Sequence, residues 1–178
     1  MRERIGQAVC KILRERQVTT LMVTHDQDQA FALADQIGVI NNGRLLQWDT
    51  AYNLYHEPAD RFIADFIGQG VFLRGTLRSA DSVDTELGVI RGNRAYGWSI
   101  GSKVDVLLRP DDIVPDADSS LYGTVVARAF KGAEILYSLH LETGSTVLSL
   151  FPSHLNHPKG ARVGIRVAAD HLVAFPTQ

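Results

Sequence analysis

The sequence predicts an α/β fragment followed by a small all-β, barrel-like domain. Apolar residues recur at helical spacing over roughly the first seventy positions, and short β-rich runs separated by Gly, Asp, Asn and Pro replace that spacing afterwards. The short glycine-containing segment 68–70 stands between the two patterns. We therefore expect two domains, over residues 1–70 and 71–178.

Composition excludes several classes of protein. A hydrophobic content of 45% in 178 residues is enough for packed cores and argues against disorder. The net charge is −2, and neither half has the basic excess of a nucleic-acid or anionic-membrane binder. Cys10 is the only cysteine, which excludes an internal disulfide and favours a reducing cytoplasm. No apolar run approaches the roughly 20 residues that span a bilayer, and residues 1–4 lead into an amphipathic helix instead of a signal peptide.

The first expected helix spans residues 2–16, because one face of that stretch is apolar. That face consists of Ile5, Val9, Ile12 and Leu13. The unbroken apolar run Leu21-Met22-Val23 follows, which is typical of a strand covered on both faces. Thr24, His25 and Asp26 come next, and a second helical pattern begins directly after them.

His25 is the candidate functional residue. It lies at the carboxyl end of the expected strand, and ligands of open α/β sheets bind outside such ends. An unperturbed imidazole pKa of about 6.5 makes both protonation states accessible. Asp26 can cap the next helix, with Gln29 in the capping-box position. A structural role for His25 and a chemical role for Asp26 both stay open on these patterns.

A β-hairpin is expected from residues 37–40 and 44–48, because the Asn42-Gly43 pair between them favours a tight hairpin turn. Two short helices follow, over about residues 50–56 and 60–67. Pro58 ends the first of them and Gly68 closes the second.

The rest of the chain predicts a small barrel or sandwich of short strands. The expected strands are Val71–Arg78, Lys103–Arg109, Gly123–Phe130, Ile135–Leu141, Thr146–Phe151, Arg162–Ala168 and Leu172–Phe175.

These stretches resemble the ATPases of ATP-binding-cassette importers, in the subfamily for maltose, polyamines, sulfate and ferric iron. The residues similar to its switch-histidine region are Val23–Gln27, Ala30, Leu33–Asp35, Gly43–Gln47, Leu54–Tyr55, Pro58–Ala59 and Phe62–Gly68. Those similar to the carboxyl-terminal regulatory domain of the same importers are Leu108–Asp112, Lys131–Glu134 with Tyr137, and His171–Pro176. The resemblance implies the end of a nucleotide-binding domain followed by an oligonucleotide-barrel-type regulatory domain.

For the chemistry, the resemblance implies that His25 bonds the γ-phosphate of ATP and steadies the attacking water. The phosphate-binding loop (Walker A), the glycine-rich signature and the Walker B run ending in Asp-Glu are not found in the sequence. The chain is therefore similar to the carboxyl-terminal part of such an ATPase. ATP and Mg²⁺ are expected for the complete protein and no cofactor for this chain alone, which is not expected to hydrolyse ATP by itself.

The function that the resemblance implies is an energy-coupling ATP-binding subunit, cytoplasmic and peripheral on the inner face of the cell membrane. The implied partners are a second copy of the subunit, transmembrane permease subunits and, indirectly, an extracytoplasmic binding protein. The β-domain looks most like the ferric-iron or polyamine branch, and of these two ferric iron is the expected substrate. The alternative is a non-catalytic module for regulation, dimerisation or binding of a small oxyanion.

Other distinctive residues receive structural interpretations. Arg109 is expected to serve the turn that leads into Pro110 and two acids. Glu134 and Tyr137 are open between hairpin packing and an inter-domain contact. The histidines 154, 157 and 171 lack metal-ligand spacing, so no metal site is expected. The two tryptophans, at positions 48 and 98, are interpreted as core or interface aromatics.

Overall fold

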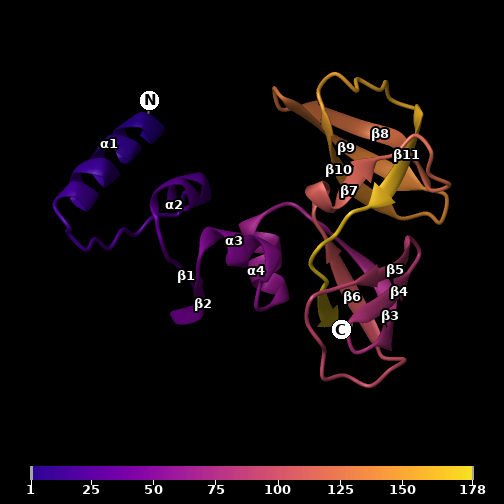
Figure 1. The fold of residues 1–178 in the computed structure, drawn as a ribbon, viewed down its shortest axis with the longest axis horizontal. Coiled ribbons are helices and arrows are strands. Elements are labelled where there is room, and N and C mark those ends of the chain that lie inside the picture. The colour runs from indigo at the N-terminus through magenta and orange to yellow at the C-terminus, as the bar shows by residue number, and fades with distance from the viewer. Residues whose placement is uncertain (1, 178) are drawn as a thin grey trace. The chain divides into compact units, whose positions relative to one another are not determined.

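The computed structural model describes residues 2–177, which form two compact units, Met1–Ile67 and Gly68–Gln178 (Figure 1). The first unit contains helices and one β-hairpin, and the second is built from strands. None of the described helices is long and apolar enough to cross a membrane.

The first unit begins with a helical pair. Helix α1 (Arg2–Glu15) packs beside α2 (Gln27–Leu33). Gln17 ends α1 in the left-handed region at φ 54°, its N–H bonds the carbonyl of Arg14, and the N–H of Val18 bonds the carbonyl of Leu13. These two bonds make a Schellman motif, which satisfies the last carbonyls of the helix.

The predicted hairpin is confirmed. Strands β1 (Ile37–Asn41) and β2 (Arg44–Asp49) pair antiparallel. Asn42 and Gly43 both have positive φ, 49° and 73°, as a two-residue hairpin turn requires. Helices α3 (Ala51–His56) and α4 (Arg61–Ile67) follow at the predicted positions. One face of the hairpin and the two helices share a small core of Val39, Leu54, Ile63 and Ile67.

The predicted strand at Leu21–Val23 is wrong for this structure. Residues 18–24 have no regular secondary structure, and the side chains of Leu21 and Val23 are 81% and 92% exposed. A strand needs a neighbour to accept and donate its backbone hydrogen bonds. Among the described residues no strand pairs with this segment. The segment therefore does not form a strand, although its apolar pattern is typical of one.

The second unit consists of two antiparallel sheets, as the sequence predicts for a small barrel-like domain. One sheet has the order β12-β6-β3-β4-β5 and the other the order β10-β9-β8-β11-β7. The strands of the first are β3 (Val71–Ser79), β4 (Ser82–Thr85), β5 (Gly88–Arg91), β6 (Lys103–Leu108) and β12 (Val173–Pro176). Those of the second are β7 (Ile113–Pro115), β8 (Tyr122–Phe130), β9 (Glu134–Leu141), β10 (Thr146–Pro152) and β11 (Arg162–Val167).

A single apolar core lies inside this unit and takes side chains from both sheets. Burial alternates along β9 and β10, so every second residue points inward. The largest fully buried side chains include Leu77 and Leu108 from one sheet and Tyr137, Leu139 and Phe151 from the other. The shared core makes the two sheets one folding unit.

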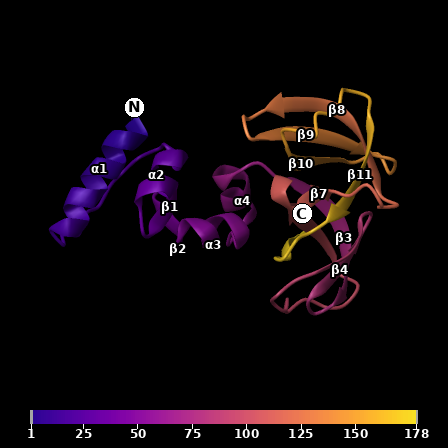
Figure 2. The same ribbon diagram turned by 45° about the horizontal axis from the view of Figure 1, so that its top comes forward.

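Two connections cross between the sheets at one place. The short 3₁₀ helix η1 (Pro110–Asp112) leads from β6 to β7, and residues 168–172 lead from β11 to β12. The N–H of Ala168 bonds the carbonyl of Asp112 at 2.7 Å, so the two crossings lie side by side. Figure 2 shows the yellow end of the chain leaving β11 for the other sheet. The sequence did not predict β4, β5 and β7, which are three or four residues long.

Candidate functional site

The candidate site is the turn at Thr24–Asp26, which two capping interactions fix. The hydroxyl oxygen of Thr24 accepts the backbone N–H of Asp26 at 3.0 Å and donates to Oε1 of Gln29 at 3.1 Å. Oδ1 of Asp26 accepts the N–H of Gln29 at 3.1 Å. Asp26 is therefore the N-cap of α2, as predicted. Gln29 does not close the capping box on Asp26, because its side chain is bonded to Thr24 instead.

His25 lies between these two capping residues, and its side chain is exposed. The backbone bends at this position. The ring is therefore available to a ligand that approaches from solvent, and it is not part of a packed interior.

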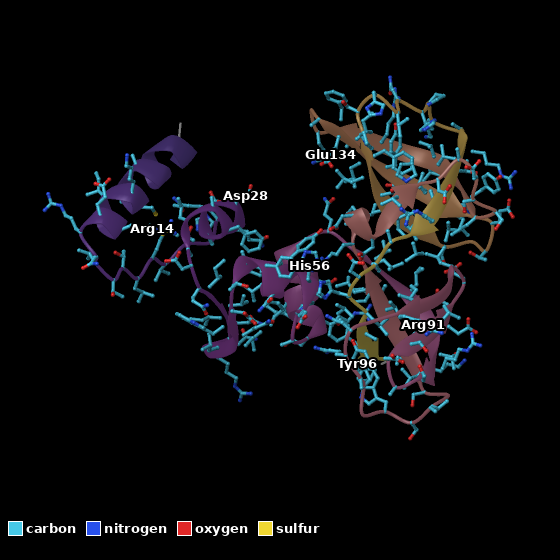
Figure 3. All side chains as sticks on the ribbon, in the orientation of Figure 1. Arg14, Asp28, His56, Arg91, Tyr96 and Glu134 are labelled. Carbon is cyan, nitrogen blue, oxygen red and sulfur yellow. The ribbon has the colours of Figure 1, made fainter. Side chains whose placement is uncertain are left out.

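Two contacts fasten the two ends of α2 within the first unit. The side-chain amide of Gln27 donates to the carbonyl of Phe66 at 2.6 Å, which fastens the start of α2 to α4. Nη2 of Arg14 lies 2.6 Å from Oδ1 of Asp35, an exposed ion pair between α1 and the residues after α2. Figure 3 labels Arg14 and Asp28 on this part of the chain. The helix that follows His25 is thus held at its start by Gln27 and just beyond its end by Asp35.

The exposed ring of His25 can donate a hydrogen bond to a phosphate oxygen. The N–H groups of Asp26 and Gln29 are already bonded to side chains, and so is the hydroxyl of Thr24. The part of the chain that the structure describes contains no group of three His, Cys, Asp or Glu side chains arranged to hold a metal. The turn therefore offers the exposed ring of His25 for a contact to a ligand.

A second cluster of charged residues occupies the crossing of the second unit. Arg109 is only 3% exposed, and its Nη1 donates to the carbonyls of Gly68 and Gln69 at 2.7 and 3.3 Å. Its backbone N–H donates to Oδ2 of Asp112 at 2.7 Å. Burial of the carboxyl group raises the pKa of Asp112 to about 6. The hydrogen bond from the backbone N–H of Arg109 acts in the opposite direction and lowers this pKa. The charge of Asp111 adds to the rise in this pKa, and those of Arg109 and His171 oppose it. Arg109 is thus a turn residue, as the sequence indicates.

Tyr137 belongs to the packing of the β8–β9 hairpin and the core. It is fully buried, its hydroxyl donates to the carbonyl of Leu155 at 2.8 Å, and it accepts the N–H of His157 at 2.9 Å. This pair of bonds holds the loop between β10 and β11 against the core. Glu134 begins β9 and is exposed at the end of the hairpin (Figure 3).

Sequence reasoning missed the role of Tyr96. This residue is 8% exposed, donates its hydroxyl to the carbonyl of Leu172 at 2.6 Å and accepts the N–H of Ala174 at 2.9 Å. Trp98 stacks on its ring with centroids 4.5 Å apart, and so packs against the core as expected. Trp48, in contrast, is 55% exposed on β2. An aromatic pair inside a polar loop was the signal that could have revealed the position of Tyr96.

Comparisons with known proteins agree on both units. Residues 106–175 match the family model described as "TOBE domain". The chain is 34% identical over 148 residues to the "Spermidine/putrescine import ATP-binding protein PotA" of Marinobacter nauticus, which covers 78% of this chain and 40% of that protein. The same-named protein of Borreliella afzelii is also 34% identical, over 82% of this chain and 42% of its own.

A third relative is the "Fe(3+) ions import ATP-binding protein FbpC" of Fusobacterium nucleatum. It is 28% identical over 98% of this chain and 48% of its own length. The chain thus spans less than half the length of these curated relatives. Among solved structures, the molybdate-bound "cytoplasmic molybdate-binding protein ModG" superposes with a TM-score of 0.50 and 16% identity, over 60% of this chain and 95% of its own. That likeness shows the fold of the β-unit alone.

Proposed function

The chain belongs to the ATP-binding subunits of ATP-binding-cassette importers and matches their carboxyl-terminal part, and on this premise we propose that it couples ATP hydrolysis to import. In this proposal residues 1–70 complete a nucleotide-binding domain, and residues 71–178 form its regulatory β-domain. The observation that carries the proposal is the exposed ring of His25, on a backbone that two capping interactions fix at the start of α2.

His25 has the chemistry that this role requires. A ring N–H donates to an oxygen of the terminal phosphate and so stabilises negative charge there. The ring also orients the attacking water by a hydrogen bond. When bound by the complete protein, ATP supplies the phosphoryl group and Mg²⁺ neutralises its charge. The caps at Thr24 and Asp26 fix the backbone that carries the imidazole before the nucleotide arrives, which lowers the entropic cost of placing the ring.

A chimera tests the assignment of His25. The chimera joins this chain to the part of the Marinobacter relative that this chain does not match. ATP hydrolysis is measured for the parent chimera, for His25→Ala and for the control Asp28→Ala. Asp28 is an exposed residue of α2. We expect hydrolysis to fall by on the order of a hundredfold in His25→Ala and to be unchanged in the control. Equal hydrolysis by the parent and His25→Ala chimeras, with ATP binding intact in both, would refute the role of His25.

We propose import of a small cation, either a polyamine or ferric iron. The Marinobacter and Borreliella relatives are named for spermidine and putrescine, and the Fusobacterium relative for Fe(3+). The sequence pattern of the β-domain favoured ferric iron, and more of the relatives named here carry the polyamine name. Uptake of labelled spermidine and of ferric iron, in cells in which the chimera replaces the resident ATPase of each importer, distinguishes the two.

The proposed partners follow from the same role. A second copy of the subunit supplies the other half of a nucleotide site, and transmembrane permease subunits hold the pair at the inner face of the cell membrane. An extracytoplasmic binding protein contributes indirectly by delivering the substrate. Co-purification of the chimera with permease subunits from detergent-solubilised membranes tests this arrangement.

The alternative, a free-standing oxyanion-binding module, receives less support. The likeness to the molybdate-binding protein is one of fold at 16% identity. An oxyanion-binding module would consist of the β-unit, and that alternative gives no role to the helical pair and the turn at His25 in the first unit. A thermal-shift screen of this chain with molybdate, tungstate and sulfate tests it, because a ligand that binds the native state raises the apparent melting temperature.

A further inference from the structure

Two side chains from distant parts of the chain bond the four residues 66–69, where the first unit ends and the second begins. The side-chain amide of Gln27 donates to the carbonyl of Phe66 at 2.6 Å. Nη1 of Arg109 donates to the carbonyls of Gly68 and Gln69 at 2.7 and 3.3 Å. We call residues 66–69 the held segment. Three of its carbonyls therefore accept hydrogen bonds from side chains that are far away in sequence.

These carbonyls need outside partners because they lie at the end of helix α4 or just beyond it. The last four carbonyls of a helix find no N–H within the helix. Phe66 is the last residue but one of α4, so Gln27 supplies a donor to one of these carbonyls. Ile67 follows it and is 5% exposed in the core of the first unit. The held segment therefore has hydrogen bonds at both ends and a packed side chain between them, unlike a flexible linker.

The hydrogen bond of Gln27 bears directly on the turn at His25. Gln27 is the first residue of α2 and lies two positions after the histidine. The capping bonds of Thr24 and Asp26 close within residues 24–29, so they fix the turn to α2 without fixing α2 to α4. None of the seven described residues of α2 is fully buried, so packing alone holds this helix weakly. Gln27 joins it to α4 across 39 residues of sequence.

Geometry is a larger effect of this bond than stability. The bond lies at the surface, and an exposed hydrogen bond contributes little to the free energy of unfolding. A misplacement of about 1 Å at a reacting group, in contrast, costs on the order of a hundredfold in rate. The bond of Gln27 therefore has more influence on where His25 lies than on whether the first unit is folded.

We propose that Gln27 is a positioning residue for His25, and that the held segment couples the turn at His25 to the β-unit through Gln27 and Arg109. While Gln27 is bonded to Phe66, the first turn of α2 keeps its place against α4, and His25 keeps its place with it. When Arg109 releases its two carbonyls, the held segment shifts and the bond of Gln27 weakens. The inference rests on the proposed function, because the place of His25 affects a reaction only if this residue meets a nucleotide.

Arg109 is suited to one end of this coupling because it is itself fixed. Its side chain is 3% exposed, and its backbone N–H donates to Oδ2 of Asp112 at 2.7 Å. It directly precedes η1, where the two connections between the sheets lie side by side. A shift of one sheet against the other therefore moves the guanidinium group and the carbonyls that it bonds. Coupling of this kind needs a continuous series of physical contacts, and the held segment supplies it.

The chimera of this chain with the Marinobacter relative tests the positioning role. Gln27→Leu removes the donor, and Gln27→Lys restores a donor that suits a carbonyl at the carboxyl end of a helix. Gln36→Leu, at an exposed glutamine outside α2, is the control. We expect Gln27→Leu to lower kcat about tenfold with the KM for ATP unchanged, Gln27→Lys to recover most of this loss, and the control to keep the parent kcat.

These measurements are made well below the melting temperature, where a loss of stability alone leaves kcat unchanged. A purely structural role of Gln27 would therefore leave kcat at the parent value. Equal kcat in the parent and Gln27→Leu chimeras would overturn the proposal, and so would an equal loss in Gln27→Leu and Gln27→Lys.

A double-mutant cycle tests the coupling through the held segment. If Arg109 acts through Gln27, Arg109→Met lowers kcat in the parent chimera and has no further effect in Gln27→Leu. Arg91→Met, on the exposed face of β5, should change kcat in neither. Insertion of two glycines between Ile67 and Gly68 relaxes the segment without removing a buried side chain, and should give the same pattern as Arg109→Met. Losses that multiply in the double variants, or parent kcat in the insertion variant, would overturn the coupling.

Amide exchange in this chain alone gives a further measurement that needs neither ATP nor the chimera. The N–H groups of Asp26 and Gln29 are bonded to the side chains of Thr24 and Asp26, so their exchange reports the state of the turn. We expect faster exchange at both in Gln27→Leu and in the insertion variant, and parent exchange in Gln36→Leu. Parent exchange at Gln29 in either of the first two would overturn the proposal.

These readouts separate the coupling from the role of His25. Faster exchange in Gln27→Leu, in a chimera whose hydrolysis is indifferent to His25→Ala, would support the link between α2 and α4 and refute the proposed function. Loss of hydrolysis in His25→Ala with parent kcat in Gln27→Leu would support the function and refute the positioning role of Gln27.

Discussion

Asp112 accepts the backbone N–H of Arg109 at 2.7 Å, while the side chain of the same arginine turns the other way and donates to the carbonyls of Gly68 and Gln69. The turn therefore joins the first residues of the β-unit to the place where both connections cross between its sheets. Arg109 is nearly fully buried there. The stability of the β-unit should respond to changes at either residue.

The unfolding free energy should depend on pH through Asp112. Burial raises its pKa from 3.8 to about 6, so the folded state prefers the neutral acid. The contribution of Asp112 to the unfolding free energy is fully present below about pH 4 and is lost as the pH rises through about 6. Asp112→Asn keeps an acceptor for the N–H of Arg109 and removes the charge. We expect this variant to be more stable than the parent at pH 7.5, by on the order of 2 kcal/mol, in urea denaturation.

The sign of this effect can be checked against a matched variant. At pH 4 the parent and Asp112→Asn should unfold at nearly the same urea concentration. Asp118→Asn, an exposed change in the loop before β8, should follow the parent at both pH values. A parent chain whose stability rises between pH 4 and pH 7.5 relative to Asp112→Asn would contradict the assignment.

Replacing Arg109 should destabilise the β-unit. In Arg109→Met the carbonyls of Gly68 and Gln69 lose their side-chain donor in a buried place, and Asp112 loses a favourable charge. The expected loss is roughly 1–3 kcal/mol of unfolding free energy, measured by chemical denaturation. Arg91→Met, on the exposed face of β5, serves as the control and should change stability by less than about 0.5 kcal/mol. Equal stability of the two variants would show that the buried donor contributes nothing.

Removing one hydroxyl should loosen the carboxyl-terminal strand. Tyr96→Phe leaves the carbonyl of Leu172 and the N–H of Ala174 without their buried partner. We expect a loss of about 1–3 kcal/mol and faster amide exchange at Ala174. Tyr122→Phe is the control, because Tyr122 is only partly buried and its ring, which the variant keeps, lies 4.0 Å from the guanidinium of Arg162. Unchanged exchange at Ala174 would contradict the role of Tyr96.

Local patterns predicted the elements that are stabilised locally. The Asn42-Gly43 turn and the cap at Asp26 depend on residues close in sequence, and the structure contains both. The strand at residues 21–23 failed because its apolar pattern is a property of a sheet, and the described chain offers it no neighbour.

The charged crossing could not be predicted for a different reason. Its residues come from positions 68, 109, 112 and 171, and only the fold of two sheets brings them together. The sequence identified the Arg-Pro-acid turn as distinctive but gave no indication that Asp112 is half-buried. Tyr96 was missed because its partners, Leu172 and Ala174, lie more than seventy residues away.

The cap of α2 should be separable from the chemistry of His25. If Asp26 acts only as the N-cap, Asp26→Asn keeps the bond to the N–H of Gln29 and leaves stability unchanged, whereas Asp26→Ala loses about 1 kcal/mol. Both effects are read from thermal unfolding of this chain. In the chimera Asp26→Asn should hydrolyse ATP at the parent rate. A large loss of hydrolysis in Asp26→Asn with unchanged stability would show that the carboxylate takes part in the reaction, and the structural interpretation of Asp26 would then be incomplete.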